Sequence, residues 1–362
     1  MSSTLIYALI FLSCIFSVIE LSKRKGYFEF LLILTAIFVY ASAIRNIYIV
    51  PDTIDYYNFY AWVPIDKGMN AFSWNISKFE TGFAFLMYLV KRLGFGHEVL
   101  FGVIALIQLA VYLRAMMLIR PLLGWKKNLW SVYFSIWCGY WGLFYGCIVL
   151  RSGLAISFMF LAHALILRGK RKSGIFYGII AILFHRTIII YPVIIIMSKK
   201  LRGMSRERSF YLLLGVMFAW VLRLQNVLLP LLTRSVFTVV KIILPAGRIA
   251  ERYVEYASSQ IVSSVIGVRV PLLMTFFLMV RPRNNEYYDY MLGIFTMNFL
   301  VTFFTSSVAI GGRLNSICLI SMLPMMIFYL MNVKFRLLER NIVCTVFIVW
   351  QFMVSLEITG IT

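Results

Sequence analysis

Long apolar runs, each close to the length of one membrane crossing, dominate the chain. A membrane-spanning helix needs about 20 such residues, whereas the spans of a β-barrel alternate apolar and polar positions over about ten. The pattern therefore favours helices and excludes a barrel. Ten crossings are predicted, at Thr4–Glu20, Phe28–Ile44, Glu98–Ile119, Asn128–Cys147, Arg151–Arg168, Ser209–Leu232, Ser264–Val280, Asp289–Ser307, Leu314–Val333 and Asn341–Leu356.

Two further apolar segments do not fit a simple crossing. Phe79–Leu93 is short for a span, and Ser173–Met197 is interrupted by His185 and Arg186. Broken helices occur in bilayers only where they line a cavity or bury against protein. We expect both segments to be broken or re-entrant.

Composition agrees with this pattern, since 62% of the 362 residues are hydrophobic and only 14% are charged, against about a quarter in ordinary soluble domains. This balance excludes a soluble enzyme, a disordered protein, a disulfide scaffold and a nucleic-acid binder. The five cysteines all lie in apolar runs without metal spacing, so they are interpreted as buried small hydrophobes. The predicted fold is all-α: a polytopic integral membrane helical bundle in which residues 1–362 form a single transmembrane domain.

The net charge is +21, from 35 basic and 14 acidic residues. Cytoplasmic loops of membrane proteins carry most lysines and arginines, which explains the larger part of this excess. With the basic clusters inside and both termini outside, two long loops face outward, at 45–78 and 233–263. Within the second, Arg248 and Arg252 belong to a predicted amphipathic helix on the membrane surface.

Several ionisable residues lie where the charge rule does not place them, and such residues are functional candidates by default. Arg151 opens an apolar helix at the predicted outer face, where its guanidinium can bind an anion such as phosphate. The alternative is an arginine that extends to lipid headgroups. His185 is a candidate general base, a phosphate donor or a packing residue, and the adjacent Arg186 favours a functional role.

Two other outer segments supply candidates. Arg313 follows Gly311 and Gly312, whose backbone permits close approach and supplies donors to an anion. The first loop carries Asp52 and Asp55, followed by Tyr56 and Tyr57, with Arg45 before them and Glu80 at the next helix start. Carboxylates and aromatic faces suit a sugar, although a divalent cation or a solvated loop is also compatible.

Phosphate-binding loops, dinucleotide fingerprints, zinc-protease motifs and nucleophile elbows are absent from the sequence. ATP hydrolysis, nicotinamide chemistry and zinc proteolysis have no support, and we expect no cofactor. No metal is expected either, because arginine alone can meet phosphate charge.

The motifs together resemble the EpsG-like branch of the Wzy-type polysaccharide polymerases, which join O-antigen, capsule or exopolysaccharide repeat units. The similarity is carried by the D-x-x-D-Y-Y segment, Glu80-x-Gly82-Phe83, Arg151-Ser-Gly-Leu-Ala, and Phe184-His185. It covers most of 45–197. Ser152 stands where the family pattern has glutamine, and Arg186 where it has a neutral residue.

The resemblance implies a membrane glycosyltransferase that moves a growing glycan from polyprenyl (undecaprenyl) diphosphate to a hydroxyl of the next lipid-linked repeat unit. Arg151 and Arg313 would stabilise the leaving diphosphate, with Arg248 or Arg252 as helpers. His185 or Glu80 would take the acceptor proton. The implied place is the bacterial inner membrane, with the site facing outward, and the implied partners are membrane lipid, a flippase and a chain-length regulator.

Three other functions remain open. A lipid-linked oligosaccharide flippase would share the basic cavity, although the two related halves typical of transporters are not found. An O-antigen ligase would use the same donor with a different acceptor. A non-catalytic membrane scaffold would tolerate loss of each candidate residue.

Overall fold

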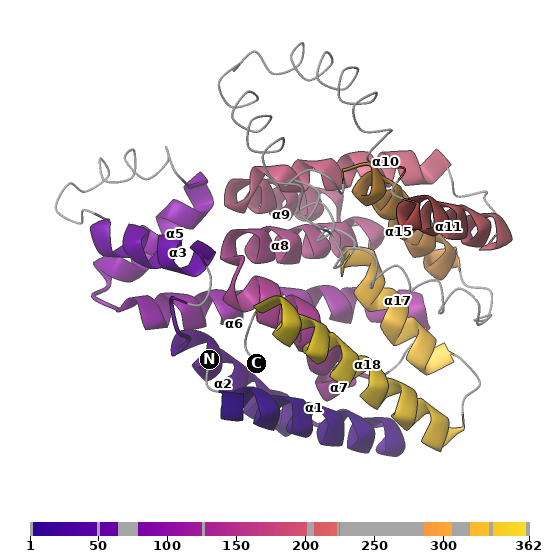
Figure 1. Cartoon of the computed structure of the whole chain (residues 1–362), viewed down its shortest axis with the longest axis horizontal. Coiled ribbons are helices and arrows are strands. Elements are labelled where there is room, and N and C mark those ends of the chain that lie inside the picture. Colours follow the sequence, from indigo (N-terminus) through magenta and orange to yellow (C-terminus); the bar gives the residue numbers. More distant parts are fainter. Residues whose placement is uncertain are drawn as a thin grey trace, which may run out of the picture. The chain divides into compact units, whose positions relative to one another are not determined.

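The computed structural model describes residues 3–48, 51–63, 79–124, 127–200, 206–222, 224, 286–305, 319–332 and 336–359. Every regular element in these ranges is a helix (Figure 1). Four of them are long and apolar enough to cross a membrane: Thr4–Lys23, His97–Leu123, Leu150–Leu167 and Leu337–Leu356. The all-helical membrane class is confirmed, and the total of ten crossings stays a prediction.

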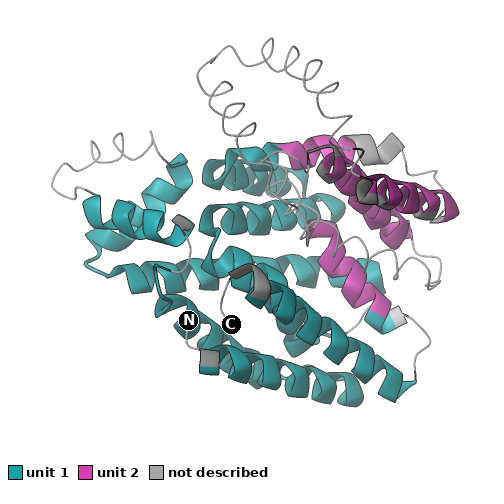
Figure 2. Ribbon diagram, in the orientation of Figure 1, with its two compact units in different colours: residues 1–189, 330–362 teal, residues 190–329 magenta. Residues whose placement is uncertain are grey.

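The chain divides into two compact units, residues 1–189 with 330–362, and residues 190–329 (Figure 2). The second unit contains α10 (Ile190–Lys200), α11 (Arg206–Val221), α15 (Glu286–Thr305) and most of α17 (Leu319–Asn332). The helices of the first unit are α1 (Ser3–Lys23), α2 (Phe28–Ala43), α3 (Pro51–Trp62), α5 (Thr81–Arg92), α6 (His97–Ile119), η1 (Arg120–Leu123), α7 (Trp130–Trp137), η2 (Cys138–Tyr145), α8 (Leu150–Leu167), α9 (Arg171–Phe184), η3 (Arg186–Ile189) and α18 (Leu337–Thr359).

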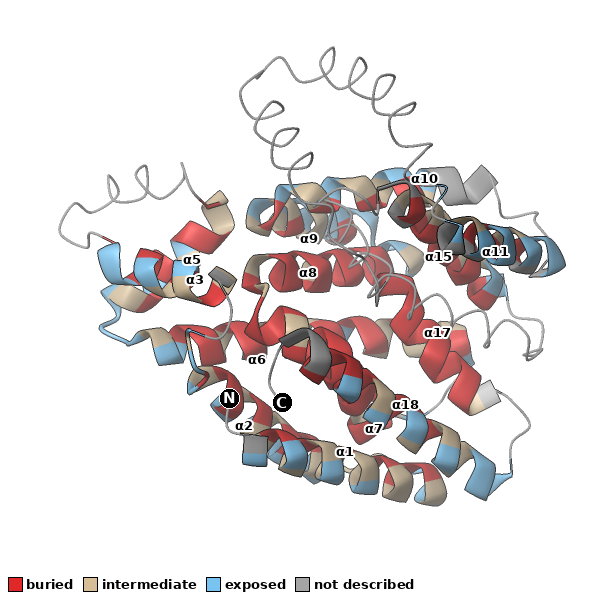
Figure 3. Cartoon of the chain, in the orientation of Figure 1, coloured by how far each residue is buried: buried red, intermediate tan, exposed pale blue. Residues whose placement is uncertain are grey.

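Helix α8 forms the core of the first unit, because most of its residues are buried and it packs on both α6 and α9 (Figure 3). An apolar sequence on all sides suits a helix enclosed by others. Small residues allow α9 to approach closely: a Cβ added at Gly174 would lie 2.9 Å from the carbonyl oxygen of Ala162. The rings of Phe158 and Phe184 stack across the same pair of helices, with centroids 5.5 Å apart.

The predicted crossing at Asn128–Cys147 is helical but changes type, since α7 continues into the π-helix η2. Close contacts accompany the change. A Cβ at Gly142 would lie 2.9 Å from the ring of Trp137, and one at Gly139 would lie 2.8 Å from Cβ of Gln351 on α18. The hydroxyl of Ser355 donates to the carbonyl oxygen of Gly139. π-Helical turns are rare and are frequently found at functional sites.

The predicted interruption of Ser173–Met197 is confirmed, since α9 ends at Phe184 and His185 is extended, with φ −160° and ψ 116°. The predicted outer loop 45–78 contains a helix, α3, over Pro51–Trp62. Proline suits the first position of a helix, because its missing N–H would have no partner there. Buried Tyr56, Phe59 and Tyr60 follow helical spacing and hold α3 against the unit. The predicted crossing at Ser264–Val280 lies outside the described residues.

Candidate active site

Three charged or titratable side chains from separate helices meet in the first unit. Glu80 immediately precedes α5, Arg151 is the second residue of α8, and His185 follows the last residue of α9. Oε2 of Glu80 accepts a hydrogen bond from Nη1 of Arg151 at 2.6 Å, and Oε1 lies 2.8 Å from Nδ1 of His185. We call Glu80, Arg151 and His185 the triad.

The backbone around Glu80 directs its side chain away from its own helix. Glu80 occupies the N-cap position of α5 in an extended conformation, and its carbonyl oxygen accepts the N–H groups of Phe83 and Ala84. The carboxylate makes no capping hydrogen bond to α5. It is therefore available to Arg151 and His185.

Gly82 allows α5 to approach the end of α9. A Cβ added at Gly82 would lie 3.0 Å from the carbonyl oxygen of Leu183 and 3.1 Å from its carbonyl carbon. Backbone atoms cannot move aside as a flexible side chain can. The glycine therefore sets the distance between the two helices, and with it the distance between Glu80 and His185.

The electrostatics of the triad favour an ionised Glu80. Burial alone would raise the pKa of Glu80, but the hydrogen bond with His185 and the charge of Arg151 outweigh it and hold the pKa at about 2. An ionised carboxylate can only accept hydrogen bonds, so Nδ1 of His185 must carry the proton. Nε2 then has a free lone pair in the neutral ring.

The second ring nitrogen of His185, Nε2, takes no part in the contact with Glu80. Nε2 is buried and has no hydrogen-bond partner among the described residues. The backbone fixes the residue, because its N–H donates to the carbonyl of Ala181 and its carbonyl accepts the N–H of Ile188. A histidine held by a carboxylate at one nitrogen and free at the other is arranged to accept a proton.

Arg151 lies at a helix N-terminus, where the helix dipole disfavours a cation. Its partners offset this cost. The guanidinium lies 4.7 Å from the centroid of the Phe79 ring, and it hydrogen-bonds both Glu80 and the hydroxyl of Tyr56. Its Nε is buried and without a hydrogen-bond partner in the described ranges. The Nε–H donor at the edge of the guanidinium is thus not used by these contacts.

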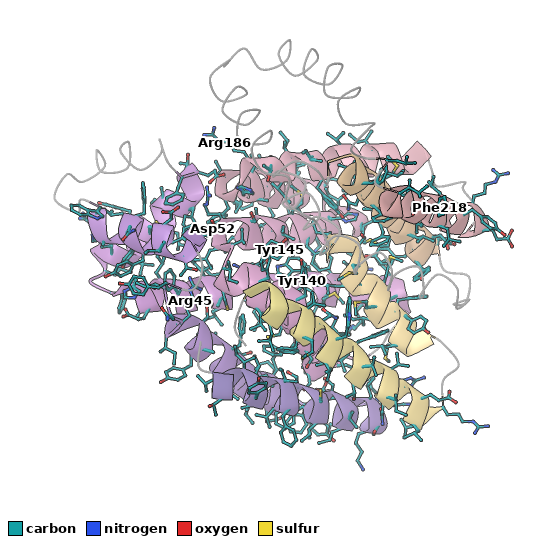
Figure 4. The ribbon with its side chains drawn as sticks, in the orientation of Figure 1. Arg45, Asp52, Tyr140, Tyr145, Arg186 and Phe218 are labelled. Carbon is teal, nitrogen blue, oxygen red and sulfur yellow. The ribbon has the colours of Figure 1, made fainter. Side chains whose placement is uncertain are left out.

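A second arginine, Arg45, is buried near the end of α2 and is only 7% exposed (Figure 4). Its guanidinium lies 3.7 Å from the centroid of the Phe101 ring, and Nη1 lies 3.5 Å from the hydroxyl of Ser42. Its Nε and Nη2 have no hydrogen-bond partner, and no carboxylate pairs with it, in the part of the chain that the structure describes. Such a buried cation is costly unless an anion joins it.

The predicted acids of the first loop lie on α3. Asp52 is half-buried (Figure 4). Asp55 is exposed and lies three residues later, on the same side of the helix. The ring of Tyr57 packs edge-on against His97. Tyr56 is buried, 1% exposed, and contacts Arg151. Tyr56 therefore contributes to the support of the triad.

Of the six predicted site residues that remain, the structure describes only Arg186. Arg186 is exposed on η3, directly after His185 (Figure 4). Five others lie outside the described residues: Arg248, Arg252, Gly311, Gly312 and Arg313. No group of three or more His, Cys, Asp or Glu side chains in the described ranges is arranged to hold a metal ion.

Sequence reasoning missed two residues beside the triad. Gln108 is fully buried on α6 and contacts the chain just before Arg151, and Phe79 packs on the guanidinium of Arg151. Gln108 could have been found, because it is a lone amide in the apolar run around 98–113. Phe79 carries no such signal among 31 phenylalanines.

Comparison with known proteins identifies a family for this chain. The model of the EpsG family matches residues 28–360, well beyond the segment whose motifs carry the resemblance. No curated protein and no solved structure matches the chain. The family resemblance is confirmed over most of the sequence.

Proposed function

Because the chain belongs to the EpsG family, we propose that it is a membrane glycosyltransferase that polymerises oligosaccharide repeat units carried on polyprenyl diphosphate. The observation that carries this proposal is the bridging carboxylate of Glu80, which joins a candidate base, His185, to a candidate phosphate ligand, Arg151. A glycosyl transfer from a diphosphate needs both groups close together.

The proposed step exchanges one bond at the anomeric carbon for another. The acceptor hydroxyl oxygen attacks C1 of the donor sugar, and the bond between C1 and the diphosphate oxygen breaks with its electron pair. The hydroxyl proton passes to Nε2 of His185. The products are the extended glycan on the acceptor lipid and free polyprenyl diphosphate, so no ATP is consumed.

Arg151 acts on the leaving group. Negative charge grows on the diphosphate oxygen as the glycosidic bond breaks. A preorganised guanidinium stabilises this charge in the transition state more strongly than it stabilises the charge of the bound substrate. Losing one such donor typically costs on the order of 10²–10³ in rate. Arg45, which lacks a carboxylate partner among the described residues, is proposed to bind a second anionic oxygen.

Glu80 serves as a positioning residue in this scheme. A carboxyl group with a pKa of about 2 is a weak base at neutral pH, which favours His185 over Glu80 as the proton acceptor. Glu80 instead fixes the tautomer of His185 and stabilises the imidazolium that forms. A carboxylate in this place commonly changes rates by several orders of magnitude.

The remaining candidates are assigned to substrate binding by the sugar and phosphate chemistry they offer. Asp52, Asp55 and Tyr57 on α3 would contact sugar hydroxyls and ring faces. The anion ligands of the outer segments would be Arg186, Arg248, Arg252 and Arg313 with Gly311 and Gly312. The site is proposed to face the outside of the bacterial inner membrane, where lipid-linked repeat units of O-antigen, capsule or exopolysaccharide are presented.

The test uses cells whose own gene is deleted and replaced by Arg151→Ala. We expect long polymer to disappear while a single repeat unit still reaches the acceptor. Arg168→Ala is the matched control, because Arg168 caps the opposite end of the same helix and is exposed. Immunoblots of membranes check that both variants insert.

The chain-length pattern separates the alternatives. A full ladder of polymer chain lengths on a gel from Arg151→Ala cells would overturn the proposal and favour a non-catalytic scaffold. Loss of all acceptor-linked sugar, including the single unit, would favour a ligase or a flippase. Purified protein in vesicles, with lipid-linked repeat units already on the outer face, extends chains if it is a polymerase and leaves them unchanged if it is a flippase.

A further inference from the structure

The chain is interrupted directly before Arg151. Tyr145 ends the π-helix η2 and Leu150 begins α8. The N–H of Val149 donates to the carbonyl of Phe144, five residues back, and not to Tyr145, four residues back. Tyr145 itself is buried in the core of the unit (Figure 4).

Gln108 donates hydrogen bonds to the backbone on both sides of this interruption from a neighbouring helix, α6. Its Nε2 donates to the carbonyl oxygen of Tyr145 at 3.3 Å and to that of Leu150 at 3.4 Å. Both acceptors are carbonyl oxygens, so only the amide nitrogen can face them, and the orientation of the amide is settled. One side chain on α6 thus holds both ends of the interruption.

Gly153 leaves room for this arrangement. A Cβ added there would lie 2.4 Å from the carbonyl oxygen of Tyr145 and 2.5 Å from Oε1 of Gln108. We call the two hydrogen bonds from Gln108 to the carbonyls of Tyr145 and Leu150 the clamp. The clamp explains why the Arg151-Ser-Gly-Leu-Ala motif has a glycine at 153. One of its two bonds holds the peptide that joins Leu150 to Arg151.

We propose that Gln108 is a positioning residue, whose amide fixes the start of α8 and so directs Arg151 toward Glu80. Its consequence for polymer synthesis rests on the proposed function, but its effect on the ion pair does not. Without the amide, the two carbonyls lose their shared donor, and the first turn of α8 has no fixed register. The guanidinium of Arg151 then loses its alignment with the carboxylate.

The experiment compares Gln108→Met with Leu109→Ala in full-length protein purified in detergent. Methionine keeps the length of glutamine without donors. Leu109 is the next residue on α6 and is also buried, so its truncation destabilises the same helix without touching the clamp. The melting temperature is measured at pH 7 and pH 3, with Glu80→Gln as the reference that has no ionisable carboxylate.

Gln108→Met should shrink the drop in melting temperature between the two pH values to less than half of the wild-type drop, close to that of Glu80→Gln. Leu109→Ala should melt lower at both pH values and keep the full drop. In cells, Gln108→Met should reduce long polymer at least tenfold, and Leu109→Ala should keep the ladder.

If the melting temperature of Gln108→Met drops between pH 7 and pH 3 by as much as that of the wild type, the proposal is overturned, whatever the amount of long polymer in cells. If Gln108→Met does not accumulate, Gln108→Leu also lacks donors and adds no titratable group, and it must show the same reduced drop. If Arg151→Ala leaves the ladder intact, the proposed function fails, while the comparison of pH values still decides the role of Gln108.

Discussion

The carboxylate of Glu80 lies 2.8 Å from Nδ1 of His185, although 105 residues separate them in the chain. The contact depends on backbone, because the helix that follows Glu80 touches the last turn of α9 at Leu183. The Glu80-x-Gly82 spacing therefore combines a chemical group with the small residue that allows it to reach its partner.

Replacing Gly82 with alanine should separate α5 from α9, because the added methyl group would meet the backbone of Leu183 at 3.0 Å. Overpacking of this kind typically costs about 1–3 kcal/mol. We expect a lower melting temperature and at least a tenfold loss of long polymer. The measurements are thermal unfolding of the purified protein and the chain-length ladder.

Gly178→Ala is the control for this substitution, since a Cβ there meets only Cβ of Ala162, at 3.9 Å. Gly178 lies on α9, and its replacement should leave the chain-length ladder unchanged. The stability should stay the same or rise by up to about 1 kcal/mol, because alanine restricts the unfolded chain more than glycine does. Equal behaviour of Gly82→Ala and Gly178→Ala would contradict the positioning role of Gly82.

Apolar length predicted α6 and α8 close to their observed bounds, and the polar pair His185-Arg186 predicted the interruption after α9. Periodicity gave no sign of the π-helical turn of η2, whose packing partner α18 lies some 200 residues later in the chain. The helix α3 was not predicted for a different reason: its tyrosines and aspartates have the composition of a loop, although Tyr56 and Phe59 pack into the core of the unit.

The triad itself was predictable as three candidates but not as one site. Charge and position indicated Arg151, His185 and Glu80 separately. Which of them touch depends on how α5, α8 and α9 pack, and single-sequence patterns carry no distance information. Tyr56, expected to contact sugar, is buried against Arg151, which the alternation of polar and aromatic residues in its segment could not reveal.

Replacing Arg151 with lysine tests whether charge alone is enough. Lysine keeps the charge, but it loses the planar fork and the contact with the Phe79 ring at 4.7 Å. We expect Arg151→Lys to restore less than about a tenth of the polymer that the wild type makes, measured as long chains per cell. Full restoration would mean that a point charge suffices and that the bidentate geometry is not used.

His185→Gln tests the proposed base. The glutamine amide can still donate to Glu80, so the fold should persist, but no group remains to accept the acceptor proton. We expect a loss of polymer of about 10²–10⁴-fold with little change in melting temperature. His97→Gln is the matched control, since His97 begins α6 and lies outside the triad. A ladder of normal length from His185→Gln would refute the assignment.

The triad also predicts how stability depends on pH. The pKa of Glu80 is about 2 in the folded protein, below its value of about 4.3 in an unfolded chain. A lowered folded-state pKa means that the unfolded state binds the proton more tightly, so the ion pair stabilises the fold fully above pH 4.5 and is lost as the pH falls toward 2. We expect up to about 3 kcal/mol of acid-sensitive stability at this site.

Glu80→Gln should remove that part of the acid sensitivity in thermal unfolding between pH 7 and pH 3. Glu98→Gln, which changes an exposed carboxylate on α6, should not. If Glu80→Gln and the wild type lose stability in parallel across this range, the carboxylate does not carry the charge that the geometry assigns to it.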